Sequence, residues 1–356
     1  MSLAEDIFRT FSTEAAGNYR LRAYGSGHIH DTFLAESDSP GAPRYILQRI
    51  NAHVFRDPEL VSRNLARITP YIAAKVQALG IADPERRYLS LIPTREGQAW
   101  QTDPAGDYWR MFPFLEGTRS LDELSHPQQA REAARAFARY AQQLDGLPVA
   151  EIGATIPHFH DAARRIAALE KAVETADQQR LTLAATEVEQ AQAWKTRISP
   201  LLHLLETGAI PRRLVHNDTK INNLLFDAHS DEALCVIDLD TVMPGTLLYD
   251  FGDLVRTCVS PAAEDETDLS RVQVRPDMYE ALLEGYLSEA GDWMQAIEKE
   301  YLTEGAILMT GIMAVRFLTD FLMGDVYYKI HHPMHNLDRA KNQFCLLQLL
   351  LAAPDR

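Results

Sequence analysis

The first third of the chain alternates short apolar runs with turns rich in glycine, proline and serine. Such runs between turn residues are typical of short strands. Five segments are predicted to be strands: residues 21–24, 32–35, 45–50, 89–93 and 108–115. Between the third and the fourth, Asp57 and Pro58 offer an N-cap and a first-turn proline, and apolar residues at helical spacing follow from Leu60 to Ile72. This part of the chain is therefore predicted to be a small sheet with one long helix.

The pattern changes after Glu116 and Gly117, where apolar residues recur at steps of three and four with charged residues between them. This periodicity is that of amphipathic helices. Long helices are predicted over 127–144, 159–176 and 184–205, and from about residue 278 to the end. One island between residues 213 and 238 lacks the periodicity and contains brief apolar runs that end in polar residues. We therefore predict an α+β protein with a small β-rich N-terminal lobe, residues 1–116, and a larger, mainly helical C-terminal lobe, residues 117–356.

Composition excludes several broad classes of protein. The 356 residues exceed one ordinary core, and a composition that is 46% apolar and 24% charged is that of a water-soluble globular protein. A net charge of −15 with no basic stripe would repel a phosphate backbone, so we expect no nucleic-acid partner. The apolar stretch from Gly305 to Val315 is too short to span a bilayer, and Glu5 and Asp6 stand where a signal peptide would be basic. We expect no membrane partner and a cytoplasmic location.

The non-helical island contains the spacing H-x-D-x-x-x-x-N, from His216 to Asn223. In phosphoryl transfer, an aspartate placed like Asp218 accepts the proton of the substrate hydroxyl, and the amide oxygen of Asn223 suits Mg²⁺. A second carboxylate must help the ion to bridge the phosphates of ATP, and Asp238 follows an apolar run fifteen residues later. Asp240 lies two residues further on and is either another ligand or a structural partner. The pattern predicts a kinase site in which Asp218 is catalytic and Asn223 and Asp238 bind the metal.

Longer strings around this motif resemble a known group of enzymes. The runs HNDTKINNLLFD and CVIDLDTVMPGTLLYDFGDLVR look like those of the aminoglycoside phosphotransferase and choline kinase group of small-molecule kinases. More narrowly, the chain is similar to N-acetylhexosamine 1-kinases in YILQRIN at 45–51, IDLDTVMPG at 237–245, DFGD at 250–253, and RFLTD and GDVYYK between 316 and 329. The resemblance implies a two-lobed, protein-kinase-like fold, ATP and Mg²⁺ as cofactors, and a small-molecule acceptor.

The tripeptide Asp250-Phe251-Gly252 spells the metal-binding DFG of protein kinases. It lies twenty-seven residues beyond Asn223, which is too far for the usual hairpin. The resemblance implies that Asp250 instead braces the catalytic loop through hydrogen bonds, with His216 also in a supporting role. Asp238 remains the predicted metal ligand.

The residues expected to bind the nucleotide form less distinct motifs than the catalytic residues do. The turn Gly25-Ser26-Gly27 lies between two predicted strands, where backbone N–H groups can fold over phosphates, but it lacks the full G-x-G-x-x-G pattern and equally suits a hairpin turn. Such kinases usually carry a phosphate-binding lysine on the third strand. Here Gln48 takes that position, and Arg49 is the alternative, because neighbouring strand residues face opposite sides. A hinge strand should hold adenine through Met111, Phe112 and Phe114, although core packing explains the two phenylalanines equally well.

A polar face on an apolar helix near the C-terminus is the candidate acceptor pocket. Arg316, Thr319 and Asp320 share this face at steps of three and four. They form either an internal ion pair between Arg316 and Asp320 or a surface that binds sugar oxygens beside Asp218. Tyr327 follows, and an aromatic ring can cover the apolar face of a pyranose. The histidines within 158–160 and 331–335 are expected to be surface or capping residues.

The motif and its surroundings predict an ATP-dependent kinase, and the resemblance to N-acetylhexosamine 1-kinases implies that it phosphorylates the anomeric hydroxyl of an N-acetylhexosamine. One alternative is a kinase of the same fold that acts on choline, homoserine, methylthioribose or an aminoglycoside, and Arg316 argues against the cationic acceptors among these. The other alternative is a nucleotide-binding protein without catalysis. The missing strand-three lysine suggests it, whereas the intact Asp218, Asn223 and Asp238 oppose it.

Overall fold

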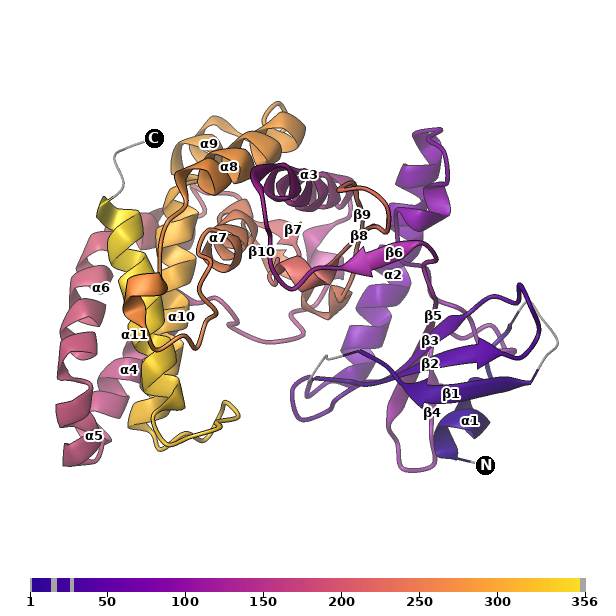
Figure 1. Cartoon of the computed structure of the whole chain (residues 1–356), viewed down its shortest axis with the longest axis horizontal. Helices are drawn as coiled ribbons and strands as arrows, with labels where there is room; N and C mark the ends of the chain where they lie inside the picture. Colours follow the sequence, from indigo (N-terminus) through magenta and orange to yellow (C-terminus); the bar gives the residue numbers. More distant parts are fainter. Residues whose placement is uncertain (1, 14–17, 26–28, 353–356) are drawn as a thin grey trace. The chain divides into compact units, whose positions relative to one another are not determined.

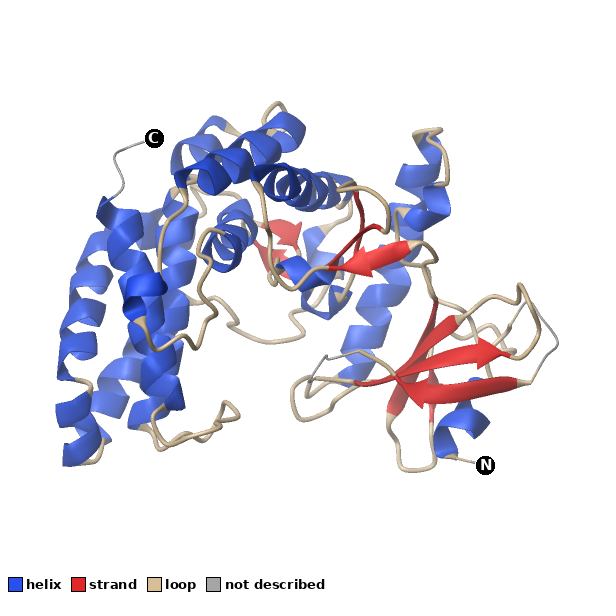
Figure 2. Ribbon diagram, in the orientation of Figure 1, coloured by secondary structure: helices blue, strands red, loops and turns tan. Residues whose placement is uncertain are grey.

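The computed structural model describes residues 2–13, 18–25 and 29–352 and contains two compact units (Figures 1 and 2). The first unit comprises Met1–Arg119, Gln143–Pro157 and Leu225–Met243. The second comprises Ser120–Gln142, His158–Leu224 and Pro244–Arg356. The first unit thus begins with the predicted N-terminal lobe and also takes in two later segments, which a single boundary at residue 116 does not anticipate.

A five-stranded antiparallel sheet forms the body of the first unit, in the order β1-β2-β3-β5-β4. The elements are a short helix α1 (Leu3–Phe8) and the strands β1 (Tyr19–Ala23), β2 (Asp31–Ser37), β3 (Tyr45–Arg49), β4 (Gln101–Thr102) and β5 (Tyr108–Pro113). Four of the five predicted strands are confirmed to within a few residues. The strand predicted over 89–93 is wrong. Ile92 N donates to Met111 O at 2.8 Å, but Pro93 has no N–H to continue the ladder, and β4 pairs with β5 instead.

The two faces of this sheet carry different residue types. Leu47, Trp109 and Met111 are buried on one face, in a cluster with the apolar residues of α1. Because side chains alternate along a strand, Gln48 and Arg110 lie on the opposite face. These two residues are direct partners in the register between β3 and β5. A polar pair is therefore placed in the middle of the sheet.

The remaining parts of the first unit are one long helix and a second small sheet. The helix predicted after Asp57 is α2 (Pro58–Ala78), and its cap is confirmed, because Asp57 Oδ1 accepts a hydrogen bond from Leu60 N at 2.9 Å. The second sheet has the order β6-β8-β9, with β6 (Thr118–Ser120), β8 (Leu224–Asp227) and β9 (Ala233–Val236). The latter two strands confirm the predicted non-helical island. Short 3₁₀ helices of this unit are η1 (Pro84–Arg86), η2 (Val149–Glu151) and η4 (Leu239–Thr241), whereas η3 (Ile221–Asn223) and η5 (Leu269–Arg271) belong to the second unit.

Helices make up most of the second unit. They are α3 (Pro127–Gln143), α4 (Ala162–Thr175), α5 (Gln178–Leu183), α6 (Ala185–Glu206), α7 (Leu247–Cys258), α8 (Pro276–Ala290), α9 (Ala296–Tyr301), α10 (Glu304–Leu322) and α11 (His335–Ala352). The long helices predicted between residues 127 and 205 are confirmed. Helix α4 starts three residues later than predicted because Asp161 caps it, accepting from Arg164 N at 3.0 Å. A short strand β7 (Arg213–Val215) pairs with β10 (Met243–Gly245).

Helix α10 lies at the centre of the core of the second unit. It packs against α11, α7 and α4. The buried cluster around it contains Trp194, Phe317, Phe321 and Phe344. By length and composition its 19 residues qualify as a membrane span, yet 83% of the apolar window is buried within the protein. Its apolar character is therefore accounted for by packing.

Helices α7 and α10 approach each other through glycines. A Cβ atom on Gly252 would lie 2.0 Å from the carbonyl oxygen of Gly305, and a Cβ atom on Gly305 would lie 2.3 Å from that of Leu248. Both distances are far below van der Waals contact, and the opposing atoms are backbone atoms that cannot rotate away. This packing therefore requires glycine on both helices.

We expect Gly252→Ala to lower the free energy of unfolding by about 3 kcal/mol, because the added methyl group overpacks a backbone contact. Urea unfolding followed by circular dichroism measures the loss. Gly208→Ala is the control: Gly208 has a φ of +73° and no atom within 4 Å of an added Cβ, so only about 1 kcal/mol of backbone strain is expected. Equal losses in the two variants would contradict the close packing of the helices.

Candidate active site

The predicted catalytic loop follows β7 in the second unit and is held by the first turns of α7. The carboxylate of Asp250 accepts hydrogen bonds from His216 N at 2.9 Å and from Asn217 N at 2.7 Å. Its backbone carbonyl accepts from Thr219 Oγ1 at 2.7 Å. Asp250 is 1% exposed, and burial raises its pKa to about 6. Hydrogen bonds to this one residue therefore fix the chain on both sides of Asp218.

The tripeptide Asp250-Phe251-Gly252 lies inside α7 and is not a metal-binding loop. The helix starts after the N-cap Thr246, whose side chain accepts from Leu248 N. Phe251 is fully buried, and Gly252 is the residue that contacts α10. The three residues thus face the catalytic loop, the core and the neighbouring helix.

Asp218 has one amide and one ammonium group as partners. The side-chain nitrogen of Asn223 donates to Asp218 Oδ2 at 3.1 Å and to Asp218 O at 2.9 Å. Lys220 Nζ lies 3.1 Å from Asp218 Oδ1. Burial opposes the charged form of Asp218, but the positive charge of Lys220 helps to offset this, and the pKa of Asp218 lies below the usual value. The carboxylate is therefore ionised at neutral pH and can accept a proton.

Asn223 and Asp238 each offer a side-chain oxygen of the kind that a divalent cation prefers. Asn223 gives its amide nitrogen to Asp218, which leaves its oxygen as a potential ligand. Asp238 lies in the first unit, two residues after β9, and its φ of +58° is in the left-handed region. The pairing of Asn223 with Asp238 around one ion joins residues of different units and stays a prediction.

A buried histidine connects the segment before α4 to the catalytic loop. His160 Nε2 lies 2.8 Å from Asn217 O, and because a carbonyl only accepts, Nε2 carries the proton. Burial lowers the pKa of His160 to about 3, so the ring is neutral. The expectation of a surface or capping histidine is therefore wrong for His160. It holds for His158, which is exposed and lies 3.3 Å from the cap residue Asp161.

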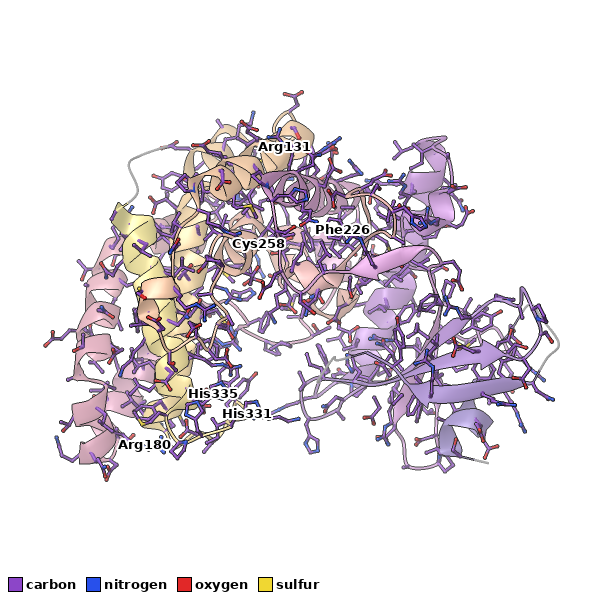
Figure 3. The ribbon with its side chains drawn as sticks, in the orientation of Figure 1. Arg131, Arg180, Phe226, Cys258, His331 and His335 are labelled. Atoms are coloured by element: carbon purple, nitrogen blue, oxygen red, sulfur yellow. The ribbon has the colours of Figure 1, made fainter. Side chains whose placement is uncertain are left out.

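The histidines of the 331–335 segment lie at the start of α11 (Figure 3). His331 N donates to His335 Nδ1 at 3.2 Å, and His335 Nε2 lies 3.4 Å from Asp265 Oδ2. His335 is buried, which lowers its pKa, whereas His331 and His332 are exposed. These contacts organise the entry into the helix.

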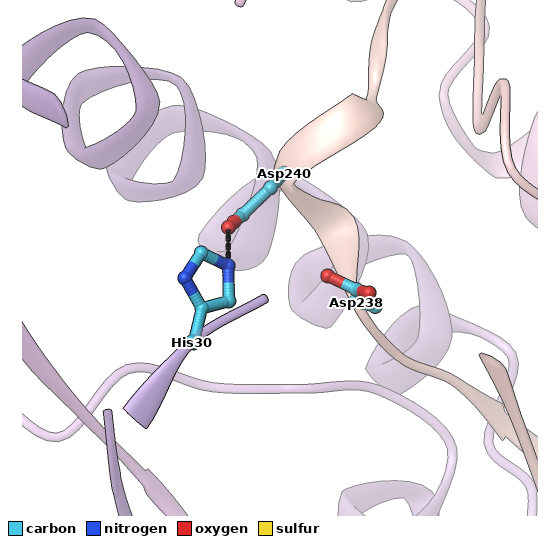
Figure 4. A group of neighbouring side chains, drawn as sticks. All are labelled: His30, Asp238 and Asp240. Atoms are coloured by element: carbon cyan, nitrogen blue, oxygen red, sulfur yellow. Dashed lines mark hydrogen bonds and ion pairs between the residues drawn. The ribbon is translucent and has the colours of Figure 1, made fainter. Parts of the chain in front are cut away.

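In the first unit, a buried ion pair clamps the segment after β9 to the sheet. Asp240 is 1% exposed and pairs with Arg110 through both oxygens, with Arg110 Nη2 2.9 Å from Oδ2. His30 Nε2 lies 2.7 Å from the same Oδ2 (Figure 4), and Thr155 Oγ1 donates to Asp240 O at 2.6 Å. Burial opposes the charge, but Arg110 and His30 hold the pKa of Asp240 well below its usual value. These contacts support the structural role predicted for Asp240 over that of a second metal ligand.

The side chains of His30, Asp238 and Asp240 come close together, with one possible ligand atom of each within 4.8 Å of the others. The hydrogen bonds argue against a metal held by all three. His30 Nδ1 accepts from Asn51 N at 3.1 Å, so the ring donates from Nε2 to Asp240 and has no lone pair left for a cation. The guanidinium of Arg110 already balances the charge of Asp240. In this group a metal role is retained as a prediction for Asp238 alone.

Gln48 takes the position of the lysine expected on the third strand, and its side chain accepts hydrogen bonds from Arg110 on the neighbouring strand β5. Gln48 Oε1 accepts from Arg110 Nε at 3.1 Å and from Arg110 Nη2 at 2.9 Å. Arg49 faces the other side of the sheet and pairs with Asp31 and Asp107. The cation beside Gln48 therefore comes from β5. The sequence analysis missed Arg110, although the alternation of side chains would have placed it beside Gln48 once the pairing of β3 with β5 was known.

Two of the residues predicted to contact phosphate or adenine lie outside the described part of the chain, namely Ser26 and Gly27. Gly25 is exposed and has a φ of +82°, as a tight turn requires. The side chain of Met111 is fully buried in the cluster with α1. This burial leaves only the backbone of Met111 for a ligand.

The two phenylalanines of the predicted hinge make contacts with arginines. The ring centroid of Phe112 lies 5.3 Å from the guanidinium carbon of Arg110, and that of Phe114 lies 4.0 Å from the guanidinium carbon of Arg44. Both distances are typical of cation–π interactions. The predicted adenine contacts of Phe112 and Phe114 stay predictions.

Asp320 supports a loop and does not pair with Arg316. Its two oxygens accept four hydrogen bonds, at 2.8 to 3.0 Å, from the backbone nitrogens of Val326, Tyr327 and Tyr328 and from Asn336 Nδ2. These bonds saturate the buried carboxylate, so the structure corrects both interpretations of Asp320. It is neither the ion-pair partner of Arg316 nor available to a sugar hydroxyl.

Arg316 has aromatic neighbours. Its guanidinium carbon lies 5.3 Å from the ring centroid of Phe159 and 5.6 Å from that of Tyr328, and Nη1 lies 3.3 Å from Met313 Sδ. Tyr327 is exposed, with its ring centroid 4.8 Å from that of Tyr328. Arg316 and these rings thus form one cluster that joins α10, the loop that follows it and the segment before α4.

Comparison with known protein families defines the class of protein: the chain is a small-molecule phosphotransferase. The profile of the phosphotransferase enzyme family (APH) matches residues 20–297. Since this match covers most of the chain, the protein belongs to that family.

Solved structures of similar fold extend over nearly the whole chain. An aminoglycoside phosphotransferase from Alicyclobacillus acidocaldarius is 12% identical in sequence and has a TM-score of 0.64. The match covers 99% of this chain and 96% of the chain of that protein. The microcompartment-associated aminopropanol kinase is 19% identical with a TM-score of 0.61 and coverages of 98% and 97%. The amicoumacin kinase hAmiN, solved with AMP-PNP, Ca²⁺ and Ami, is 14% identical with a TM-score of 0.59 and coverages of 95% and 92%. The predicted protein-kinase-like fold is confirmed.

Replacing His160 should change how stability responds to acid. Because the pKa of His160 falls from 6.5 to about 3 on folding, the unfolded state binds an extra proton between these values. The residue should thus lower the free energy of unfolding by up to about 1.4 kcal/mol for each pH unit below 6.5. Urea unfolding between pH 6.5 and about pH 5 should show a steeper loss in the wild type than in His160→Gln. The exposed His158→Gln should behave like the wild type, and a wild-type slope in His160→Gln would contradict a buried neutral ring.

Removing Arg110 would leave Asp240 buried without a counter-charge. We expect Arg110→Met to lower the free energy of unfolding by about 3 kcal/mol or more, and the double variant with Asp240→Asn to regain part of the loss. Arg49→Met is the matched control on the opposite face of the sheet. Its ion pairs are exposed, so it should cost less than about 1 kcal/mol. The free energy of unfolding of all three variants is measured by denaturant unfolding. Equal values for Arg110→Met and Arg49→Met would contradict a structural role for the ion pair between Arg110 and Asp240.

Proposed function

We propose that this phosphotransferase is an ATP-dependent kinase that phosphorylates the anomeric hydroxyl of an N-acetylhexosamine and releases the sugar 1-phosphate. The observation that carries the proposal is the catalytic loop. It holds an ionised Asp218 next to Lys220 and Asn223, on a backbone that Asp250 braces. Phosphoryl transfer asks a protein mainly for positioning and charge neutralisation, and this loop supplies both.

In the proposed reaction, Asp218 accepts the proton of the acceptor hydroxyl while that oxygen attacks the γ-phosphorus of ATP and ADP leaves. A carboxylate whose pKa lies below its usual value is ionised before the substrate arrives. Lys220, 3.1 Å from Asp218, presents a positive charge beside the group that is transferred. Asn223 Oδ1 and the Asp238 carboxylate would hold a Mg²⁺ ion, which neutralises charge on the triphosphate.

The acceptor side supports a sugar. Among the described residues Arg316 has no carboxylate partner, and it lies against the rings of Phe159 and Tyr328. A guanidinium group donates readily to hydroxyl and carbonyl oxygens, and an aromatic ring can cover the apolar face of a pyranose. The exposed ring of Tyr327 offers such a surface.

The competing function within the family is phosphorylation of another small alcohol. Solved proteins of the same fold include an aminopropanol kinase and an amicoumacin kinase. A cationic acceptor is usually held by carboxylates or an aromatic cage, whereas here it would meet the guanidinium group of Arg316. A nucleotide-binding protein without catalysis, the remaining alternative, has no use for an ionised and braced Asp218.

Asp218→Asn should lower kcat by about a thousandfold or more, because the amide cannot accept the proton. Release of ADP is measured across a panel of N-acetylhexosamines, free hexoses and amino alcohols, with ATP binding measured by calorimetry. The exposed Asp122→Asn is the control and should retain full activity.

We expect turnover with N-acetylhexosamines, and unchanged ATP binding in Asp218→Asn. Turnover confined to amino alcohols would replace the proposed acceptor. Turnover near the wild-type rate in Asp218→Asn would remove this residue from the role of base.

A further inference from the structure

Two arginines converge beside the catalytic loop, where the sequence singled out only one. Arg316 of α10 lies over the ring of Phe159, with its guanidinium carbon 5.3 Å from the ring centroid. Arg165 of α4 binds the backbone of the same segment: its Nη2 donates to Phe159 O at 3.0 Å and to His158 O at 3.3 Å. Both guanidinium groups are thus anchored on Phe159, one on its ring and the other on its carbonyl.

Neither arginine has an acidic partner among the described residues. Asp161, at the start of α4, pairs instead with His158 at 3.3 Å and with Arg164 at 3.4 Å. Asp320 is saturated by the loop after α10. In keeping with this, burial and the positive charge of Arg316 lower the pKa of Arg165. The cluster therefore carries uncompensated positive charge.

Three buried polar atoms of this cluster have no hydrogen-bond partner in the described structure: Arg165 Nε, Tyr328 Oη and His160 Nδ1. The ring of Tyr328 lies 5.6 Å from the guanidinium carbon of Arg316, and the ring of His160 lies 4.2 Å from that of Phe159. Native proteins leave few buried polar groups unpaired, because each one costs free energy. These three atoms leave hydrogen-bonding capacity in the cluster that a polar ligand can use.

The cluster adjoins the loop that carries the predicted base. His160 Nε2 donates to Asn217 O at 2.8 Å, and Asn217 directly precedes Asp218 in the chain. All of these residues belong to the second unit. The charges of Arg316, Asp218 and Arg165 all act on the His160 ring, so the two arginines lie close to the loop that carries Asp218.

We propose that Arg165 and Arg316 form one acceptor subsite, which selects molecules without a positive charge by binding their electron-rich oxygens. The inference rests on the proposed kinase function and adds Arg165 as a specificity-determining residue. Two neighbouring guanidinium groups repel an ammonium group, and their N–H donors match hydroxyl, carbonyl and carboxylate oxygens. An N-acetylhexosamine offers its acetamido oxygen, whereas the corresponding amino sugar presents an ammonium group.

The test compares matched pairs that differ only in acetylation of the nitrogen. Calorimetry measures the binding of glucosamine and N-acetylglucosamine, and of 1-amino-2-propanol and its N-acetyl derivative, to the full chain with AMP-PNP and Mg²⁺ at a fixed pH near 6.5. We expect the wild type to bind an acetylated member at least about tenfold more tightly than its ammonium partner, and Arg165→Gln to reduce that ratio by about tenfold. The ratio is the readout, because simple damage to the fold would weaken both members equally.

Two further variants separate charge at the subsite from charge elsewhere on α4. Arg165→Lys keeps the charge and should keep the preference. Arg164→Gln removes an exposed charge one position earlier and should leave the ratio unchanged. Tighter binding of the ammonium members, no binding of either acetylated member, or an unchanged ratio in Arg165→Gln would overturn the inference. The proposed function is tested separately by ADP release. If that function is wrong, N-acetylhexosamines will cause no ADP release, whatever the binding ratio is.

Discussion

A carboxylate can act as a base only when it is ionised and held in place, and for Asp218, the proposed base, both conditions depend on a second, buried carboxylate. Asp250 accepts the backbone N–H groups of His216 and Asn217 from within the first turns of α7. These bonds fix the loop that carries Asp218 and Lys220 as neighbours, 3.1 Å apart. The charge of Lys220 then keeps Asp218 ionised despite its burial. Asp250 thus holds the loop on which Asp218 and Lys220 are neighbours, and this arrangement keeps Asp218 ionised.

In the first unit, a buried arginine and a buried aspartate likewise fix a segment of the chain. Arg110 reaches from the centre of the sheet to Asp240, and Gln48 holds the guanidinium from the side. A buried ion pair adds little net stability compared with apolar packing, but breaking it is costly, so it favours a single arrangement of the chain. The arrangement fixed here is that of the segment after β9, which carries Asp238 two residues before Asp240.

Local pattern was enough to predict most elements and to locate the non-helical segment that carries the H-x-D-x-x-x-x-N spacing. Strands, helices and caps such as Asp57 follow from residues close in sequence, and the H-x-D-x-x-x-x-N spacing is itself local. The contacts that were missed join distant segments. Arg110 and Asp240 are 130 residues apart, and His160 meets Asn217 across 57 residues. Such contacts depend on which strands pair and which helices pack, so they became visible only in the structure. Helical spacing placed Arg316 and Asp320 on one face and so suggested an ion pair between them. It did not reveal that backbone N–H groups of the following loop donate hydrogen bonds to the Asp320 carboxylate.

The location of Asp250-Phe251-Gly252 within a helix removes a means of control. In protein kinases, rotation of the phenylalanine in this tripeptide separates active from inactive states. Here the ring is fully buried, and the glycine is wedged against the backbone of α10. Flipping the segment would require melting α7, which would also release the catalytic loop. A switch based on rotation of Phe251 is therefore incompatible with the helix in which the tripeptide lies.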